Sequence, residues 1–178
     1  MDTGQIFLDH SRAFLREEYR IKLRRAVEAL PEDALWWRPN EHANSVGNLL
    51  LHLAGNVRQW IVSGIGGASD VRDRASEFAA CEGGSAQELL GRLERVVQEA
   101  DEVLARLDPD DLTARRTIQG RDVTILDAIY QVVQHFALHL GQIILVAKER
   151  APGAIRFYED AGGLARPIWK EMDAGTPR

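Results

Sequence analysis

Residues 124–150, TILDAIYQVVQHFALHLGQIILVAKER, form the longest stretch of helical periodicity in the chain. Apolar residues recur there at steps of three and four, so one face of the segment is predicted to pack in a hydrophobic core. Pro152–Gly153 would end the helix. The predicted core seam consists of Leu126, Ile129, Val133, Phe136, Leu140, Ile143 and Ala147.

Three further segments show the same spacing of apolar residues. They run over residues 5–30, from a cap at Asn44 or Ser45 to Gly64, and from a cap at Ser85 to Leu107. No segment shows sustained two-residue alternation between turn signals, so we expect little or no strand. Four long amphipathic helices predict an all-α four-helix bundle, folded as a single domain over residues 1–178.

Two segments lie outside these helices. Residues 64–84 connect the second helix to the third, which is long enough to cross over the bundle or to carry an extra short helix. The tail after Pro152 forms a short C-terminal extension, which we expect to fold back on the body through a short helix.

The composition excludes several classes of protein. The net charge of −5 gives no general attraction to nucleic acid or to an anionic membrane. The apolar runs are broken before the roughly 18–20 residues that a membrane span requires, and the N-terminus lacks the pattern of a signal peptide. Cys81 is the single cysteine, so no internal disulfide forms, and we expect a cytoplasmic protein. A role of Cys81 as a ligand or nucleophile is not favoured, because it lies far in the sequence from the histidine motifs.

His135 and His139 are four residues apart in the last predicted helix. This spacing places them about 40° apart on one helix face, where two imidazoles can chelate one ion. A metalloprotease motif would need Glu directly after the first histidine, and Phe136 stands there, which disfavours peptidase activity. Ile125, Ala128, Val132 and Val146 lie on the same side of the helix, so we expect the pair to face the interior or a cleft.

His52 offers a third ligand. It lies in a polar stripe of the second predicted helix, which otherwise is apolar. The stripe consists of Asn48, His52, Gly55, Asn56 and Gln59. Asn56, Gln59 and Gln142 could orient the ligands or a bound water by hydrogen bonds. Spacing alone leaves two readings open, a metal site and a set of buried histidines satisfied by neighbours.

The motifs carry a resemblance to a known family. LWWRPNEHANSVGNLLLHLAGNVRQW (residues 35–60) and QHFALHLGQI (residues 134–143) resemble the DinB-like (DinB/YfiT) superfamily, and within it an uncharacterised bacterial DinB-like subgroup. The resemblance implies a four-helix bundle with a long crossover between helices 2 and 3. It also implies a divalent metal ion, zinc or nickel, on His52, His135 and His139.

The resemblance further implies a homodimer. Leu138 and Leu145 lie on the side of the fourth helix away from its seam. They could cover part of the dimer interface or pack under the C-terminal tail.

Characterised relatives include transferases that use low-molecular-weight thiols such as bacillithiol or mycothiol. The resemblance therefore implies a metal-dependent thiol S-transferase that acts on an electrophilic small molecule. Two alternatives remain: a non-catalytic metal-binding bundle that serves as a dimeric binding module, and a metal-dependent hydrolase. Neither histidine face carries Glu or Asp as a general base, so the sequence assigns no catalytic residue.

Overall fold

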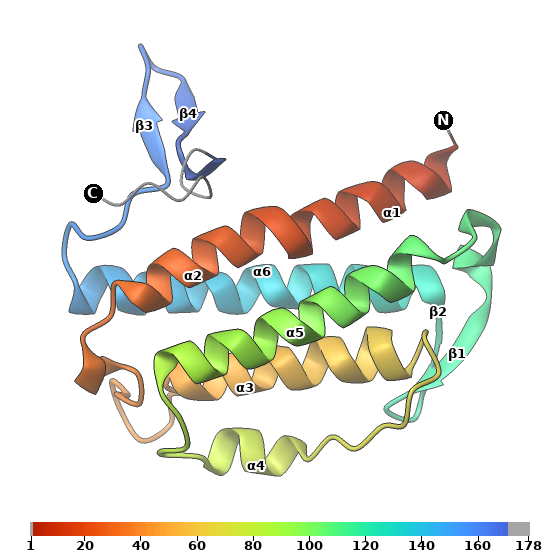
Figure 1. The fold of residues 1–178 in the computed structure, drawn as a ribbon, viewed down its shortest axis with the longest axis horizontal. Coiled ribbons are helices and arrows are strands. Elements are labelled where there is room, and N and C mark those ends of the chain that lie inside the picture. The colour runs from red at the N-terminus through yellow and green to blue at the C-terminus, as the bar shows by residue number, and fades with distance from the viewer. Residues whose placement is uncertain (1, 171–178) are drawn as a thin grey trace.

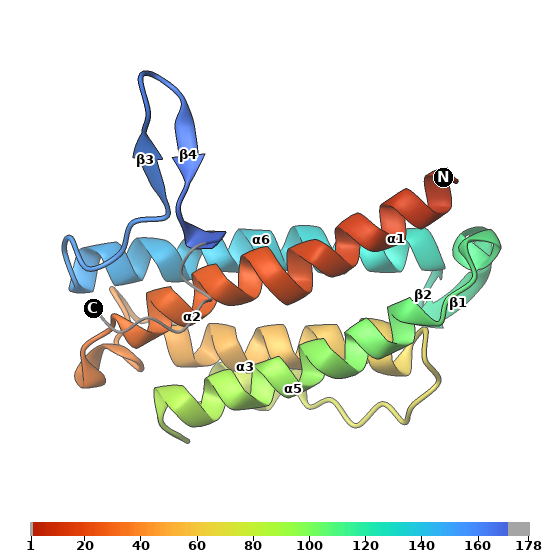
Figure 2. The ribbon, with the colours of Figure 1, turned by 45° about the horizontal axis from the view of Figure 1, so that its top comes forward.

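The computed structural model describes residues 2–170, and in them four long helical stretches lie side by side (Figures 1 and 2). The first stretch is α1 (Thr3–Ala13), the π-helical turn η1 (Phe14–Tyr19) and α2 (Arg20–Glu28). The others are α3 (Val46–Val57) with the π-helical η3 (Arg58–Ser63), α5 (Ala86–Ala105) and α6 (Ile125–Arg150). The predicted all-α four-helix bundle is confirmed.

The helices begin where their capping residues predict. The side chains of Ser45, Ser85 and Thr124 each accept a hydrogen bond from the backbone N–H three residues ahead, and the side chain of that later residue accepts one from the backbone N–H of the cap. These capping boxes satisfy backbone N–H groups that have no partner inside the helix. Of the two predicted caps for α3, Asn44 and Ser45, the structure uses Ser45.

The helix α6 packs against α2, α3 and η3. Its buried residues are Ile125, Ala128, Ile129, Val132, Phe136, Leu140, Ile143 and Ala147. The predicted seam is wrong at Leu126, which is 40% exposed. The buried face is rotated toward Ile125, Ala128 and Val132, the side that carries the histidines, because α3 packs there.

By length and composition alone, α6 is the one helix among the described residues that could cross a membrane. The position of α6 in the bundle also accounts for its apolar composition, because a helix that packs on several neighbours needs apolar residues on several sides.

The crossover between α3 and α5 contains one short helix, α4 (Arg74–Ala79), which packs on α3. Asn48 on α3 donates from Nδ2 to the backbone carbonyls of Glu77 at 2.8 Å and Ala80 at 2.7 Å. Arg38 donates from Nη2 to the same Ala80 carbonyl at 2.8 Å. These bonds hold the crossover backbone along α3. Figure 1 shows this segment, with α4, running beneath α3.

The structure adds short segments that the sequence analysis left open. A hairpin of β1 (Arg115–Ile118) and β2 (Arg121–Thr124) turns at Gln119 and Gly120, both with positive φ, and leads directly into α6. Two 3-10 turns cover Glu32–Ala34 and Pro109–Thr113.

The tail was predicted wrongly in one respect. It forms a hairpin of β3 (Tyr158–Asp160) and β4 (Ala165–Pro167) in place of a short helix. Phe157 and Trp169, on either side of the hairpin, pack against Ile21, so the tail does fold back on the bundle.

Candidate metal centre

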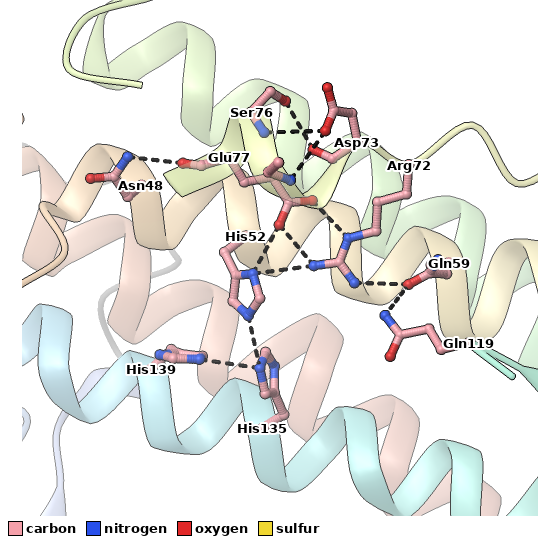
Figure 3. A network of polar contacts seen from close by, with 11 residues as sticks. Asn48, His52, Gln59, Arg72, Asp73, Ser76, Glu77, Gln119, His135 and His139 are labelled. Atoms are coloured by element: carbon pink, nitrogen blue, oxygen red, sulfur yellow. Dashed lines mark hydrogen bonds and ion pairs between the residues drawn. The ribbon is translucent and has the colours of Figure 1, made fainter. Parts of the chain in front are cut away.

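Three histidines from two antiparallel helices converge inside the bundle (Figure 3). His52 comes from α3, and His135 and His139 come from α6. The Nε2 atom of His135 lies 3.0 Å from Nε2 of His52 and 3.1 Å from Nε2 of His139. One ring nitrogen from each histidine lies within 4.8 Å of the others, so the cluster could hold a metal ion.

The imidazoles of α6 are held neutral by their surroundings. Burial lowers the pKa of His135 to about 3, with further lowering by the charges of His139, His52, Arg72 and Arg74. Burial likewise lowers the pKa of His139, against a hydrogen bond with Gln142 that raises it. Because only a neutral imidazole has a free lone pair, this is the protonation state that a metal ligand needs.

Glu77 fixes which nitrogen of His52 carries the proton. Its Oε2 lies 2.9 Å from Nδ1 of His52. Burial alone would raise the pKa of Glu77, but hydrogen bonds from Arg72 and His52 outweigh it and the pKa is lowered. The side chain is therefore a carboxylate, which can only accept, so Nδ1 of His52 is the N–H and Nε2 has the lone pair. Arg72 Nη2 lies 3.1 Å from Nδ1 of His52 and donates to Glu77 Oε2 at 2.8 Å. The Oε2 atom therefore accepts from both Arg72 and His52.

Gln142 makes the corresponding contact at His139. Its Oε1 lies 2.7 Å from Nδ1 of His139, which assigns the proton to Nδ1 and the lone pair to Nε2. Two lone pairs thus point at Nε2 of His135, whose other nitrogen, Nδ1, is buried without a hydrogen-bond partner within residues 2–170. A single proton on Nε2 of His135 can satisfy only one of these two lone pairs. A cation between the three Nε2 atoms satisfies all three, so this donor set fits a metal ion.

Gln59, another of the predicted orienting residues, lies one step further from the histidines. Gln59 accepts from Arg72 Nη1 at 2.9 Å, donates to Asp70 at 2.7 Å, and also accepts from Gln119. Its contact is with Arg72, which lies beside Nδ1 of His52, and not with the imidazole itself. Asn56 is buried, and its Oδ1 has no hydrogen-bond partner in the part of the chain that the structure describes.

Glu77 and Arg72 were missed by the sequence analysis. They lie in the crossover, 25 and 20 residues from His52, where no helical spacing relates them to the histidines. The histidine-bearing faces of α3 and α6 carry no Asp or Glu, but the crossover brings the carboxylate of Glu77 to His52. The signal that the sequence did offer was Gly55 in the polar stripe, because a glycine in a helix leaves room for another segment to approach closely. Cys81 is exposed and is outside the histidine cluster.

Comparisons with known proteins agree with this architecture. A family described as "Protein of unknown function (DUF1572)" matches residues 2–155. The crystal structure of a DinB-like protein, YjoA, from Bacillus subtilis superposes with a TM-score of 0.62 at 20% sequence identity. The match covers 86% of this chain and 96% of that chain. No curated protein matches the sequence significantly.

Proposed function

We propose that this chain, which belongs to DUF1572, a DinB-like family of proteins of unknown function, binds one divalent metal ion at His52, His135 and His139. The observation that carries the proposal is the convergence of three Nε2 atoms, two of which have their lone pairs assigned by Glu77 and Gln142. Zinc and nickel are the proposed metals, since both take imidazole ligands readily.

We propose metal-dependent thiol transfer as the reaction, with an electrophilic small molecule as the acceptor. Three imidazoles leave a divalent ion with an open position and net positive charge, and an ion in this state lowers the pKa of a bound thiol or water. The resemblance to the DinB-like superfamily supports a low-molecular-weight thiol of the bacillithiol or mycothiol type. Such thiols are kept reduced in the cytoplasm, where we place the protein.

The surroundings of the histidines favour a nucleophile that needs no general base. Glu77 is engaged by Arg72 and His52, and no other acid joins the histidine cluster within residues 2–170. Arg74 lies near enough for its charge to act on His135, whereas the charge of Arg72 is paired with that of Glu77. This positive charge favours an anionic ligand, and a thiolate forms more readily than hydroxide.

Metal analysis of protein purified without a histidine tag tests the site. We expect about one equivalent of zinc or nickel per chain in the wild type and a large loss in His135→Ala. His42→Ala, which changes an exposed histidine outside the cluster, is the control and should keep the metal. Sub-stoichiometric metal in the wild type, after loading with excess zinc and removal of free ion, would overturn the proposal.

Cobalt substitution tests the reaction. Addition of a low-molecular-weight thiol should shift the visible cobalt bands and add a thiolate charge-transfer band, because the thiol enters the open position. A spectrum that thiols leave unchanged, but that azide or another small anion changes, would favour the hydrolase. A spectrum that neither changes would indicate a closed site and the non-catalytic binding module.

We also propose that the protein forms a homodimer through α6. Leu138 and Leu145 are 57% and 67% exposed, so the described part of the tail does not cover them. Tyr130 lies on the same helix and is 62% exposed. Light scattering should give a dimer mass for the wild type and a monomer mass for Leu138→Glu/Leu145→Glu. A wild-type monomer at micromolar concentration would contradict this.

A further inference from the structure

The crossover places a buried carboxylate directly against a candidate metal ligand. In the side chains of His52, Arg72 and Glu77 only 5%, 5% and 8% of the surface is exposed. Arg72 donates from Nε to Glu77 Oε1 at 2.7 Å and from Nη2 to Oε2 at 2.8 Å. Both carboxylate oxygens are thus held by a fork of two N–H groups, which fixes the plane of the carboxylate as well as its position.

Gly55 provides the space that this carboxylate occupies. A Cβ atom at Gly55 would lie 2.0 Å from Glu77 Oε1 and 2.8 Å from Arg72 Nε. Any other residue at this position of α3 would push the carboxylate away from its present place. Glycine in a helix costs about 1 kcal/mol relative to alanine, so its presence here is accounted for by the close approach of Glu77.

Side chains other than Glu77 hold the crossover backbone on α3. Asn48 and Arg38 already bind the backbone carbonyls of Glu77 and Ala80, and none of these bonds involves the Glu77 side chain. Arg72 lies only five residues before Glu77, so their ion pair joins two parts of the same crossover segment. Within residues 2–170, the hydrogen bond that the carboxylate makes outside this segment is the one with His52.

We propose that Glu77 is the positioning residue of the metal centre: held by Arg72 in the space left by Gly55, it keeps the proton of His52 on Nδ1. The Nε2 lone pair then faces the ion. In the other tautomer the Nε2 proton would point at His135 and into the place of the metal. This inference rests on the proposed function, and it gives the long crossover a role in the chemistry.

The tautomer of His52 can be read in metal-free protein by long-range ¹H–¹⁵N NMR of the imidazoles. The wild type and Glu77→Gln, which keeps an acceptor oxygen, should show the proton on Nδ1. The double variant Arg72→Met/Glu77→Met removes the acceptor without leaving an unpaired buried charge, and should show a mixture of tautomers or the Nε2-protonated form.

Zinc affinity, measured by competition with a chromogenic chelator, gives the second readout. We expect the double variant to bind zinc about 10- to 100-fold more weakly than the wild type. Glu77→Gln should lie closer to the wild type than to the double variant. Asp101→Asn, which changes a buried carboxylate on α5 outside the histidine cluster, is the matched control and should bind as the wild type does.

The outcomes separate the two proposals. A wild type that binds no zinc overturns the proposed function, whatever the tautomer of His52. A wild type that binds zinc while the double variant binds it equally well overturns the positioning role alone. Glu77→Gln that keeps the His52 proton on Nδ1 but binds zinc as weakly as the double variant also overturns it, because charge and not the hydrogen bond to His52 would then be what matters.

Discussion

Two buried carboxylates of similar exposure serve different purposes in this bundle. Glu77 is 7% exposed and Asp101 is 6% exposed, and each binds arginine. Asp101 on α5 accepts from Arg12 at 2.8 Å and from Arg16 at 3.1 Å, both on the first helical stretch. Its ion pairs therefore join two long helices that are far apart in the sequence.

Glu77 forms its ion pair with an arginine of the same crossover segment, and its other hydrogen bond is with a histidine. The Arg72 side chain is 5% exposed, whereas those of Arg12 and Arg16 are 29% and 54% exposed. The pair at Glu77 is thus largely buried, and the cluster at Asp101 reaches water. The comparison teaches that a carboxylate used for orientation is held by a local, buried partner, whereas one used for assembly binds across helices.

The largest expected effect is the difference in stability between two variants, each of which removes one of these carboxylates. Glu77→Ala leaves Arg72 buried without its counter-charge, so the free energy of unfolding of the metal-free protein should fall by about 3–5 kcal/mol. Asp101→Ala leaves arginines that can turn to solvent, and the fall should be about 1–2 kcal/mol. Urea unfolding followed by circular dichroism measures both. An equal or larger loss at Asp101 would contradict the comparison.

Gly55→Ala should separate metal affinity from stability. The added Cβ displaces the Glu77 carboxylate, so zinc affinity should fall about 10-fold, within the range seen when a partner of a metal-binding histidine is lost. The helix itself gains about 1 kcal/mol from alanine, which offsets part of the strain, so the free energy of unfolding should fall by less than it does in Glu77→Ala.

Gly91→Ala in α5 is the matched control for Gly55→Ala. The nearest atom to its added Cβ would be 3.9 Å away, so this variant should gain about 0.5–1 kcal/mol and keep its zinc affinity. The same loss of affinity in both glycine variants would show that the effect does not arise at Glu77.

The smallest effect is expected at Gln142, the second orienting contact. This residue is exposed, and within residues 2–170 its neutral amide binds His139 without a partner of the kind that Arg72 provides for Glu77. Gln142→Ala should weaken zinc binding by about two- to fivefold, the worth of one neutral hydrogen bond. Gln134→Ala, an exposed glutamine of the same helix, should leave the affinity unchanged. A loss at Gln142 that exceeds the loss in Arg72→Met/Glu77→Met would reverse the ranking of the two contacts.

The elements that the sequence predicted well are those whose signals are local. Ser45 and Ser85 were among the predicted caps, and each precedes a helix by one residue. Thr124 caps the helix that was predicted over residues 124–150. The histidine triad was also predicted, because an i,i+4 pair and a polar stripe appear in the helical spacing and the family resemblance joins them.

The parts that could not be predicted depend on tertiary contacts. Leu126 was placed in the core because periodicity gives the shape of an apolar face but not which neighbour covers it. The tail hairpin consists of two strands of three residues, too short to show alternation. Glu77 reaches His52 only because Asn48 and Arg38 dock the crossover on α3, and nothing in the spacing of residues 64–84 records that docking.

The contact between His52 and His135 joins residues that are 83 positions apart in the chain. An ion bound to both would act as a removable cross-link that closes a loop of this length. Cross-links of this kind restrict the unfolded chain, and for a loop of such size the entropic model gives about 4–5 kcal/mol. The resistance of the protein to unfolding and proteolysis would then follow the free metal concentration, so that chelation would shorten its lifetime without any change in its sequence.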